Sequence, residues 1–555
     1  METRFLEADV LIIGGGSAGC MAANRALELN PQLKVVIFEK GDIKYSGSIA
    51  RGMDALNVVA IPNFTTPELF VESNTIACGG ILDVPPAFEM ASRSFDLLKK
   101  LESWGVYFPV DEEGNYRTLQ MHPKGKFLTA MEEPNLKVMI SRLAAEKGTL
   151  VVNRTMGLRL LLDGGRVGGA VGIDVRTGDL AVCAAKTVVL SSGGQARFGL
   201  PNSGHLYGTF DFPGNTGDGF VMGFEAGARL TGMEYHQRVT IVKDLNCPLL
   251  SICVVRGGKM LDVLDNILMQ WNCWDMAKAN HAALSGLGPL RIRLSHLPVE
   301  VIQEIESILF TTERPVQERF FKKRKIDFRT HDIELWPTEV QLCGGHGLSG
   351  LVVNERAETN IPGLYAAGDA SCVAKGYLTG AFVFGEIAAE QAVSFAASQG
   401  APKVDSIQIE NVRKKIMKRN AQPDKRIDVR DIEFKVRRLI NDYLVSPKNT
   451  YKLNRWLEWA GIFQKELDEE VATENVHDLI KSFEVENIVK CATFSALASL
   501  ERKESRWGNA HQRTDFPNLD DQSWLCHVDV QKGEDEEVKA FKRPLIRKLA
   551  CGGVL

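Results

Sequence analysis

The stretch V-L-I-I-G-G-G-S-A-G-C, from Val10 to Cys20, decides the fold, because it joins a run of four apolar residues to three consecutive glycines. Val10–Ile13 is typical of a buried parallel strand, and Ala18–Leu29 of a helix that begins at the glycines. The segment Lys34–Glu39 predicts a second buried strand that ends in an acid. This order of strand, glycine turn, helix and strand predicts a Rossmann-like α/β unit.

The spacing of the glycines predicts a dinucleotide site. The pattern G-x-G-x-x-G falls on Gly14, Gly16 and Gly19. The first permits a tight turn, the second lets backbone N–H groups reach a pyrophosphate, and the third allows close packing of helix on strand. The helix N-terminus adds positive partial charge, and Glu39 is placed to accept hydrogen bonds from a ribose diol. We assign three neighbours to the same site: Ser17, Ala18 and Lys40.

Bulk composition limits the other possibilities. With 555 residues the chain is expected to form two to four structural units, and its net charge of −4 indicates no particular class of partner. The eleven cysteines are odd in number and lack a C-x-x-C spacing, so we expect no disulfide framework and no zinc, iron–sulfur or other metal site. The N-terminus, M-E-T-R-F-L-E-A-D, has acidic residues and no apolar signal core, and no uninterrupted apolar run reaches the length of a membrane span, so a cytoplasmic protein is expected.

Three later segments indicate which dinucleotide binds. Leu160–Val175 predicts a β-meander with a Gly-Gly hairpin, Lys186–Gly194 another buried strand, and Asn360–Ala370 a strand that ends in Gly-Asp. Together with the first unit they resemble the FAD-binding domain of the glutathione-reductase-like flavoproteins. In that family the last acid binds the ribityl or phosphate region of FAD. The resemblance implies FAD, with these further contacts: Ser192, Gly193, Gly368, Asp369 and Ala381.

Two more stretches narrow the resemblance. Thr216–Glu234, which holds Asp218 as a further cofactor contact, and Glu504–His527 resemble the flavoprotein subunits of succinate dehydrogenase and fumarate reductase. They are still more similar to the alpha subunit of adenylylsulfate reductase, and the resemblance covers nearly the whole chain. It implies an FAD domain split between residues 1–235 and 344–400, an α+β capping domain at 236–343 and a helical region at 401–555. The charged, helix-prone segment Val412–Leu500 supports the last part.

The loop Lys44–Asn57 departs from the succinate dehydrogenases, which commonly tether FAD through a histidine at this place. Here Ser46 occupies that position, and the first histidine of the chain is His122. A histidyl tether from this loop is therefore impossible, and we expect noncovalent FAD. An untethered flavin should have a lower potential, which suits reduction of a substrate. The loop's predicted cofactor contacts are Ser46, Gly47 and Gly52.

The predicted substrate side departs from the dicarboxylate enzymes as well. Val239 and Val340 align with the two histidines by which the succinate and fumarate enzymes bind a dicarboxylate. The stretch C-G-G-H-G instead resembles the G-S-H-A-G of the adenylylsulfate branch, so His346 falls at that branch's active-site histidine. We predict that His346 binds or protonates the substrate. The alternative is a histidine that only forms a turn between glycines.

The basic partner of this histidine is less well defined. The adenylylsulfate branch has an arginine just before a Lys-Asp pair, but here Ile241 precedes the corresponding segment, and Arg238 is the nearest guanidinium. Arg238 is therefore a predicted catalytic residue, although it can also be interpreted as an ion-pair partner of Glu234. Lys375 is predicted to face flavin or substrate, with a solvent-exposed position as the alternative.

Two aromatic positions and one basic run have open interpretations. Trp336 and Trp507 are expected to pack in the core, and either can also form a wall of a planar pocket. The run Phe321–Lys325 is expected to be a solvated face, with docking of an acidic ferredoxin-like protein as the alternative.

The leading functional hypothesis is an FAD-dependent reductase or dehydrogenase that exchanges electrons with a separate iron–sulfur, ferredoxin-like protein. Its substrate is predicted to be a small anion, because Arg and His supply positive charge at the reacting centre. A fumarate-reductase-like or aspartate-oxidase-like enzyme acting on a small carboxylate is the alternative. A flavin-binding RNA-modification protein is a further hypothesis, but the absence of a strongly basic domain argues against a nucleic-acid partner.

Overall fold

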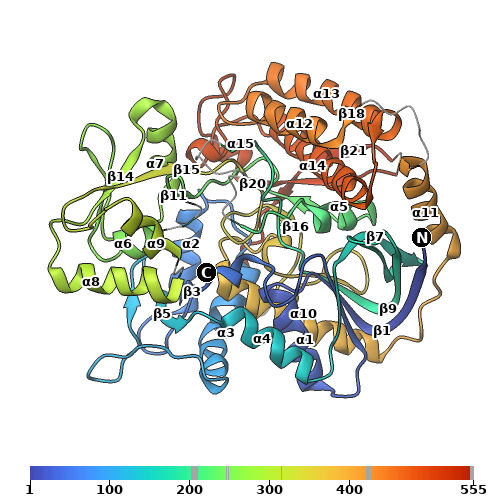
Figure 1. The fold of residues 1–555 in the computed structure, drawn as a ribbon, viewed down its shortest axis with the longest axis horizontal. Helices are drawn as coiled ribbons and strands as arrows, with labels where there is room; N and C mark the ends of the chain where they lie inside the picture. Colours follow the sequence, from blue (N-terminus) through green and yellow to red (C-terminus); the bar gives the residue numbers. More distant parts are fainter. Residues whose placement is uncertain are drawn as a thin grey trace.

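The computed structural model describes residues 1–201, 211–245, 247, 249–313, 316–420, 427–534 and 536–549. Three parts are visible in Figure 1: a sheet flanked by helices at the lower right, a smaller sheet with its own helices at the left, and a group of long helices at the top. The fold is mixed α/β, with a mostly parallel central sheet, a smaller capping domain and a largely helical C-terminal region.

The central sheet has seven strands in the order β6-β2-β1-β9-β8-β7, with β17 pairing with β9. The pairs β6–β2, β2–β1, β1–β9 and β9–β17 are parallel, whereas β7, β8 and β9 form an antiparallel meander. The parallel strands all end at one edge, which is the edge where ligands bind in open α/β sheets. The strand bounds are β1 Thr3–Ile13, β2 Val35–Glu39, β6 Leu150–Asn153, β7 Thr155–Asp163, β8 Arg166–Asp174, β9 Leu180–Leu190 and β17 Leu364–Ala366.

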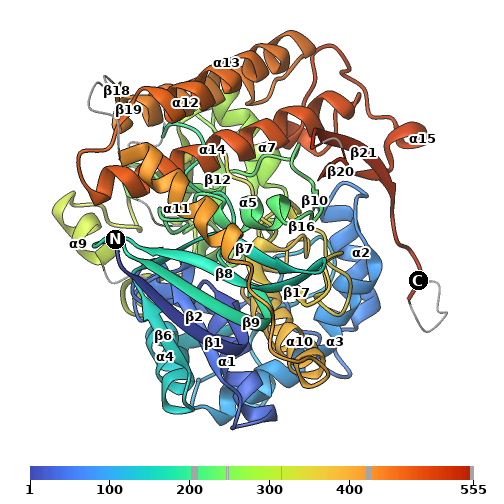
Figure 2. The same cartoon turned by 90° about the vertical axis from the view of Figure 1, so that its right-hand side faces the viewer.

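Helices α1 (Ser17–Leu29) and α10 (Tyr377–Ala397) cover one face of this sheet (Figure 2). Gly19 lets α1 lie against the turn that follows β1, because a Cβ there would be 2.0 Å from the Gly14 carbonyl oxygen. Gly385 lets α10 approach α1, because a Cβ there would be 2.5 Å from the Ala18 carbonyl oxygen. On the other face the meander packs against α11 and α14 through Met156, Ile173, Ile416, Ile480 and Phe483. The sheet is therefore buried on both faces, as its near-continuous apolar strands require.

Smaller elements complete the N-terminal part. A three-stranded sheet in the order β3-β5-β4 and helices α2, α3 and α4 lie beside α1 and α10 (Figure 1). Helix α5 belongs to the same part of the chain. Their bounds are β3 Met53–Leu56, α2 Pro67–Ala77, α3 Val84–Ser103, β4 Thr118–Leu119, β5 Leu128–Glu133, α4 Leu136–Glu146 and α5 Asp218–Glu225.

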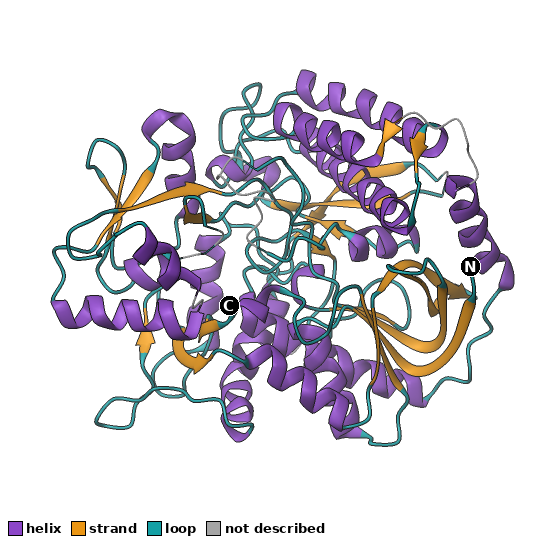
Figure 3. Ribbon diagram, in the orientation of Figure 1, coloured by secondary structure: helices purple, strands orange, loops and turns teal. Residues whose placement is uncertain are grey.

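The capping domain has a five-stranded antiparallel sheet in the order β11-β15-β14-β12-β13 and a separate apolar core. It projects to the left in Figures 1 and 3. Phe321 of the basic run belongs to this core, whereas the cations that follow it are exposed. The bounds are β11 Thr240–Val242, α6 Leu250–Val254, β12 Lys259–Leu261, β13 Ile267–Met269, α7 Met276–Ala282, β14 Leu290–Arg293, α8 Val299–Ser307, α9 Val316–Lys323 and β15 Ile333–Pro337.

The C-terminal region is helical up to Glu501 and then adds a β-hairpin. The hairpin strands β20 and β21 join β10 and β16 in a four-stranded sheet, in which Val528 and Val530 are buried. All residues from Cys526 to Val530 in β20 are buried, so this strand is covered on both faces. The bounds are β10 Leu230–Thr231, β16 Gly350–Leu351, α11 Ser406–Asn420, β18 Ile427–Asp428, α12 Val429–Tyr443, α13 Thr450–Glu469, β19 Val471–Ala472, α14 Val476–Glu501, α15 Asp521–Trp524, β20 Cys526–Lys532 and β21 Val538–Pro544.

Within the described parts of the chain, no helix has both the length and the apolar character needed to cross a lipid bilayer. The same residues contain no group of three or more His, Cys, Asp or Glu side chains that could hold a metal ion. The ten cysteines of the described residues all have free thiols.

Candidate active site

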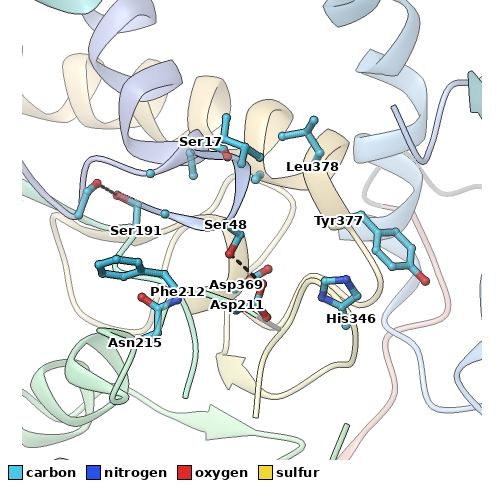
Figure 4. Close-up of a pocket in the computed structure, with 18 of the residues that line it drawn as sticks. Ser17, Ser48, Ser191, Asp211, Phe212, Asn215, His346, Asp369, Tyr377 and Leu378 are labelled. Carbon is cyan, nitrogen blue, oxygen red and sulfur yellow. Dashed lines mark hydrogen bonds between the residues drawn. The ribbon is translucent and has the colours of Figure 1, made fainter. Parts of the chain in front are cut away.

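A cavity of about 280 Å³ lies at the carboxyl edge of the central sheet and extends under the capping domain. Figure 4 shows part of it, with Ser17 and Leu378 above, Ser48 in the middle and His346 beside Tyr377. We call its two ends the dinucleotide end and the cap end. The dinucleotide end is formed by Gly14, Gly16, Ser17, Glu39 and Ser191, and the cap end by Arg238, Trp274, His346, Lys375 and Tyr377.

The glycine turn leaves bare backbone at the dinucleotide end. Gly14 has a φ of 99°, and a Cβ there would lie 2.6 Å from the Ser191 carbonyl oxygen, so only glycine fits. Gly16 differs, because the nearest atom to a Cβ on it, again the Ser191 oxygen, is 4.0 Å away. Its open space belongs to the cavity wall, and a side chain would fill it. The turn therefore fits a group as bulky as a pyrophosphate.

No side chain caps the N-terminus of α1, so the N–H groups of its first turn receive no hydrogen-bond acceptor from a cap. The N-cap residue is Gly16, and the first turn has no acid. Such a helix end favours an anion through its free N–H groups and its dipole. The Glu39 carboxylate is held at the cavity wall by the N–H groups of Gly15, at 2.7 Å, and Gly41, at 2.6 Å. These donor and acceptor groups fit the diphosphate and ribose of a dinucleotide.

Lys40 and Asp218, two predicted cofactor contacts, line the cavity but are bound to one another. The Lys40 Nζ lies 3.0 Å from Asp218 and 2.8 Å from Glu484 of α14, and Glu484 also pairs with Arg197. Burial alone lowers the pKa of Lys40, but the two carboxylates outweigh it and raise that pKa above its ordinary value. Although burial opposes the shift, Lys40 and Arg197 lower the pKa of Glu484 to about 2. The network therefore connects α14 of the C-terminal region to the cavity wall.

The serine loop is placed differently from its prediction. Ser46 is buried away from the cavity wall, its hydroxyl has no hydrogen-bond partner, and Gly52 also lies outside the wall. Gly47 does line the cavity, as does Ser48, whose hydroxyl donates to Asp211 at 2.8 Å. The prediction identified the loop but missed Ser48, because a glycine with positive φ at 47 turns the chain between the two serines.

Six more predicted cofactor residues line the cavity: Ala18, Ser192, Gly193, Gly368, Asp369 and Ala381. The last predicted cofactor residue, Gly19, lies outside the wall and packs against the Gly14 carbonyl. Of the six, Ala18 and Gly368 pack together, since a Cβ on Gly368 would lie 3.2 Å from the Ala18 side chain. Helix α10 also points its N-terminus at this region, without a side-chain cap or an acid in its first turn. Its positive end suits a part of the ligand that gains negative charge on reduction.

Two glycines bring His346 to the cap end. A Cβ on Gly344 would lie 1.8 Å from the Ser371 carbonyl oxygen, and one on Gly345 would lie 1.9 Å from the Asp369 carboxylate. Without side chains at these positions, the segment passes directly against the end of β17. His346 lines the cavity and contacts the ring of Tyr377 edge-on, with 5.4 Å between ring centroids. The histidine therefore faces the cavity.

Lys375 is fixed next to this turn. Its backbone N–H donates to the carbonyl oxygens of Gly344, at 3.1 Å, and Gly347, at 2.9 Å, and its φ of 49° is unusual for a residue with a side chain. The side chain is buried at the cavity wall, with Nζ 5.0 Å from the Trp507 ring. Among the described residues no carboxylate lies within ion-pair distance of it. Burial lowers the pKa of Lys375.

Arg238 does not pair with Glu234, whose carboxylate binds Arg502 at 2.7 Å instead. Segment 237–239 pairs with segment 338–341 through backbone hydrogen bonds, which places Arg238 at the cavity wall. No carboxylate of the described residues forms an ion pair with its guanidinium, and burial lowers its pKa to about 10, against the opposing field of Glu339. The cap end therefore contains two cations, Arg238 and Lys375, that form no ion pair with any carboxylate of the described residues.

Neither tryptophan considered in the sequence lines the cavity. Trp336 lies in β15, and Trp507 packs behind Lys375 and against Tyr235. The tryptophan of the wall is Trp274, just before α7 of the capping domain. His122 was also missed: it lines the cavity, its Nε2 lies 2.8 Å from the Asn57 carbonyl oxygen, and burial lowers its pKa to about 4. No motif or spacing marks either residue, because each reaches the cavity through long-range packing.

The fold and this cavity define an FAD-binding flavoprotein, since the bare glycine turn, the Glu39 carboxylate and two helix N-termini open onto one elongated space. Residues 9–381 match the FAD binding domain family, and residues 465–550 match the fumarate reductase flavoprotein C-terminal family. The chain belongs to the FAD binding domain family. It is an FAD-dependent oxidoreductase of the fumarate reductase and succinate dehydrogenase flavoprotein group. The predicted family, fold class and cofactor are confirmed.

Individual relatives agree with this placement. An uncharacterized FAD-dependent oxidoreductase of Methanocaldococcus jannaschii is 27% identical over 95% of this chain and 96% of its own. One subunit of the CoM/CoB fumarate reductase of Methanothermobacter marburgensis is 26% identical over 93% of this chain and 96% of its own. The adenylylsulfate reductase of Archaeoglobus fulgidus has a similar structure, with a TM-score of 0.88 at 24% identity, covering 98% of this chain and 96% of that one.

Proposed function

We propose that this protein is a cytoplasmic reductase or dehydrogenase that acts on a small organic anion and exchanges electrons with a separate iron–sulfur protein. The observation that supports this proposal is the continuity of the cavity. A single space runs from the glycine turn to the two unpaired cations, Arg238 and Lys375, and to His346. A cofactor at one end and an anion at the other would therefore meet inside it.

The residues that would hold FAD are Gly14, Gly16, Ser17, Glu39, Gly368 and Asp369. When bound, the flavin supplies the transfer of two electrons. Arg238 and Lys375 attract and orient the anion, and they stabilise negative charge that develops on it during the reaction. His346 binds the substrate or moves a proton at one of its ring nitrogens. Burial of the cap end excludes water and strengthens these electrostatic interactions.

The iron–sulfur partner is proposed from the family resemblance and from the cysteine pattern, which has no C-x-x-C spacing for a cluster within this chain. The noncovalent state of FAD is proposed because Ser46 replaces the tethering histidine and His122, the first histidine in sequence, binds the Asn57 carbonyl.

The test is anaerobic reoxidation of the reduced flavin. The holoprotein is photoreduced and mixed with adenylylsulfate, fumarate, sulfur oxyanions and other small acids, while flavin absorbance is followed. We expect one of these anions to reoxidise the flavin faster than buffer alone. Arg238→Met should weaken the response to that anion, because the cation that attracts it is lost. Photoreduced two-cluster ferredoxin should in turn reduce the oxidised flavin.

Reoxidation by oxygen alone, with no response to any anion, would contradict the proposal. That result would favour a self-contained oxidase, as in the aspartate-oxidase-like alternative. A neighbouring gene for a two-cluster ferredoxin-like protein would support the proposed partner.

A further inference from the structure

Part of the wall of the cap end is apolar, a feature that the proposed function does not use. Apolar and sulfur-containing side chains of both the capping domain and the FAD domain line the cavity together with the two cations and His346. The capping domain contributes Val239, Cys273, Trp274 and Met276, and the FAD domain contributes Met53, Met121 and Tyr377. Sulfur atoms and aromatic rings thus form an apolar patch that a substrate body would touch.

Two positions at which the resembled families have a substrate-binding donor carry apolar residues here, although Gln237, Thr240 and Ser251 also line the cavity. Val239 lines the cavity at the position where the sequence comparison with the dicarboxylate enzymes places a histidine. Ile241, which stands where the adenylylsulfate branch has an arginine, is fully buried in β11 and lies outside the wall. Both replacements exchange a hydrogen-bond donor for a branched apolar side chain. The capping side therefore offers Arg238 as its single charged residue among the described wall residues.

The free energy of transfer from water decides which substrate body suits such a wall. A carboxylate placed against Val239, Met276 and the face of the Trp274 ring would lose its hydration without gaining a donor from these surfaces. A flat apolar group of similar length would gain from burial and from contact with the indole ring. The cavity thus favours one charged end and one apolar end in the same molecule.

We propose that the substrate carries a single acidic group and a flat apolar body that lies against Trp274. This inference rests on the proposed function, since it names the class of the anion. The acidic group is held by Arg238 or Lys375, and Val239 and Trp274 determine specificity for the body. Dicarboxylates are poor ligands of this cavity.

Binding to the oxidised holoprotein tests this inference without turnover. Three acids share the acrylate unit and differ only at C3: fumarate has a carboxylate there, crotonate a methyl group and cinnamate a phenyl group. Each is titrated while the flavin difference spectrum and the melting temperature are recorded. We expect cinnamate to have a dissociation constant at least about 10-fold below that of fumarate, with crotonate between them, as burial of a phenyl ring implies.

Two variants assign the effect to residues. Trp274→Ala should remove most of the advantage of cinnamate, because the indole face is lost. Trp271→Ala is the matched control: Trp271 belongs to the same domain but is 60% exposed and lies outside the wall, so it should leave binding unchanged. Val239→His should strengthen fumarate binding by restoring a donor at the wall.

The inference is overturned if fumarate binds as tightly as cinnamate, if none of the three acids binds at millimolar concentration, or if Trp274→Ala leaves their order intact. The neutral ester methyl cinnamate separates this result from failure of the proposed function. If the ester binds as well as the acid, the apolar body is supported and the anionic substrate is wrong. If cinnamate binds but no acid reoxidises the flavin, the proposed reaction fails and the specificity of the cavity stands.

Discussion

The two ends of the cavity are built in different ways. At the dinucleotide end the contacts are mostly backbone, supplied by the turn from Gly14 to Ser17, with the Glu39 carboxylate one strand away. At the cap end they are side chains that arrive on separate segments, with Arg238, Trp274 and His346 as examples. A pyrophosphate needs bare N–H groups, which a short motif provides, whereas a specific anion needs side chains in a defined arrangement.

The largest effect is expected at the dinucleotide end, from Gly16→Val. The added side chain would occupy the open space beside the Ser191 carbonyl, so the purified variant should contain no FAD. Flavin absorbance per protein is the measurement. The control is Gly461→Val in α13, where a Cβ meets no atom within 4 Å, and this variant should keep its flavin. A stoichiometric FAD spectrum in the Gly16 variant would show that the phosphate turn is misplaced.

Acid precipitation tests whether the dinucleotide end holds FAD by contacts alone. All yellow colour should pass into the supernatant, since Ser46 replaces the tethering histidine and lies away from the cavity wall. Absorbance of the supernatant and of the dissolved pellet is compared. Flavin that stays with the pellet would mean that another residue forms a covalent bond.

At the cap end, His346→Asn should lower turnover per bound flavin by roughly 10²–10⁴-fold, the range for a group that moves a proton in the transition state. FAD content should stay near that of the wild type. His236→Asn is the control, because His236 is buried away from the cavity, with its Nε2 2.7 Å from the Ser495 hydroxyl. It should melt earlier but turn over normally. If His346→Asn also melts earlier but turns over normally, the catalytic assignment of His346 is wrong.

The Lys40 network links the dinucleotide end to the C-terminal helices, and Glu484→Gln should weaken that link. Loss of one carboxylate from a buried ion network costs about 3–5 kcal/mol of unfolding free energy, here at the lower end, because Lys40 keeps Asp218 and Arg197 keeps Glu433. Denaturant unfolding measures it.

The network also gives a pH dependence. Since folding lowers the pKa of Glu484 to about 2 from an ordinary 4.5, the wild type should lose its advantage over Glu484→Gln as pH falls through that interval. Glu458→Gln is the control, because Glu458 is exposed and pairs only with Arg455, so the change should cost at most about 1 kcal/mol. Equal losses in the two variants would contradict the importance of the buried network.

The smallest effect concerns Glu339, whose buried carboxylate has no hydrogen-bond partner for either oxygen among the described residues. Burial raises its pKa to about 8 from an ordinary 4.5, although Arg437 and Arg238 oppose the shift. The folded state thus holds the proton more tightly, and the wild type should lose stability as pH rises through this interval. Glu339→Gln cannot ionise, so its melting temperature should increase relative to that of the wild type as the pH rises through this interval. A constant difference would show that Glu339 is already charged.

Prediction from sequence succeeded where contacts are local. The segments around Gly14, Glu39 and Gly368, each predicted to contact the cofactor, all lie at the cavity, because consecutive residues at the end of a strand stay together whatever the rest of the chain does. At the serine loop the same reasoning was two residues off, since the turn at Gly47 exposes Ser48 and buries Ser46. The pattern identified the loop but not the orientation of its side chains.

The sequence by itself determined the Rossmann-like unit, the FAD family and the lack of a histidine for a tether, because these follow from residue types at short spacing. Only the tertiary structure decided that Trp274 rather than Trp507 lines the cavity, and that Arg238 faces it while Glu234 is taken by Arg502. The reason is that segments far apart in sequence must pack before these side chains meet. That packing depends on close backbone approaches, such as Gly345 against Asp369, whose partners no local pattern names.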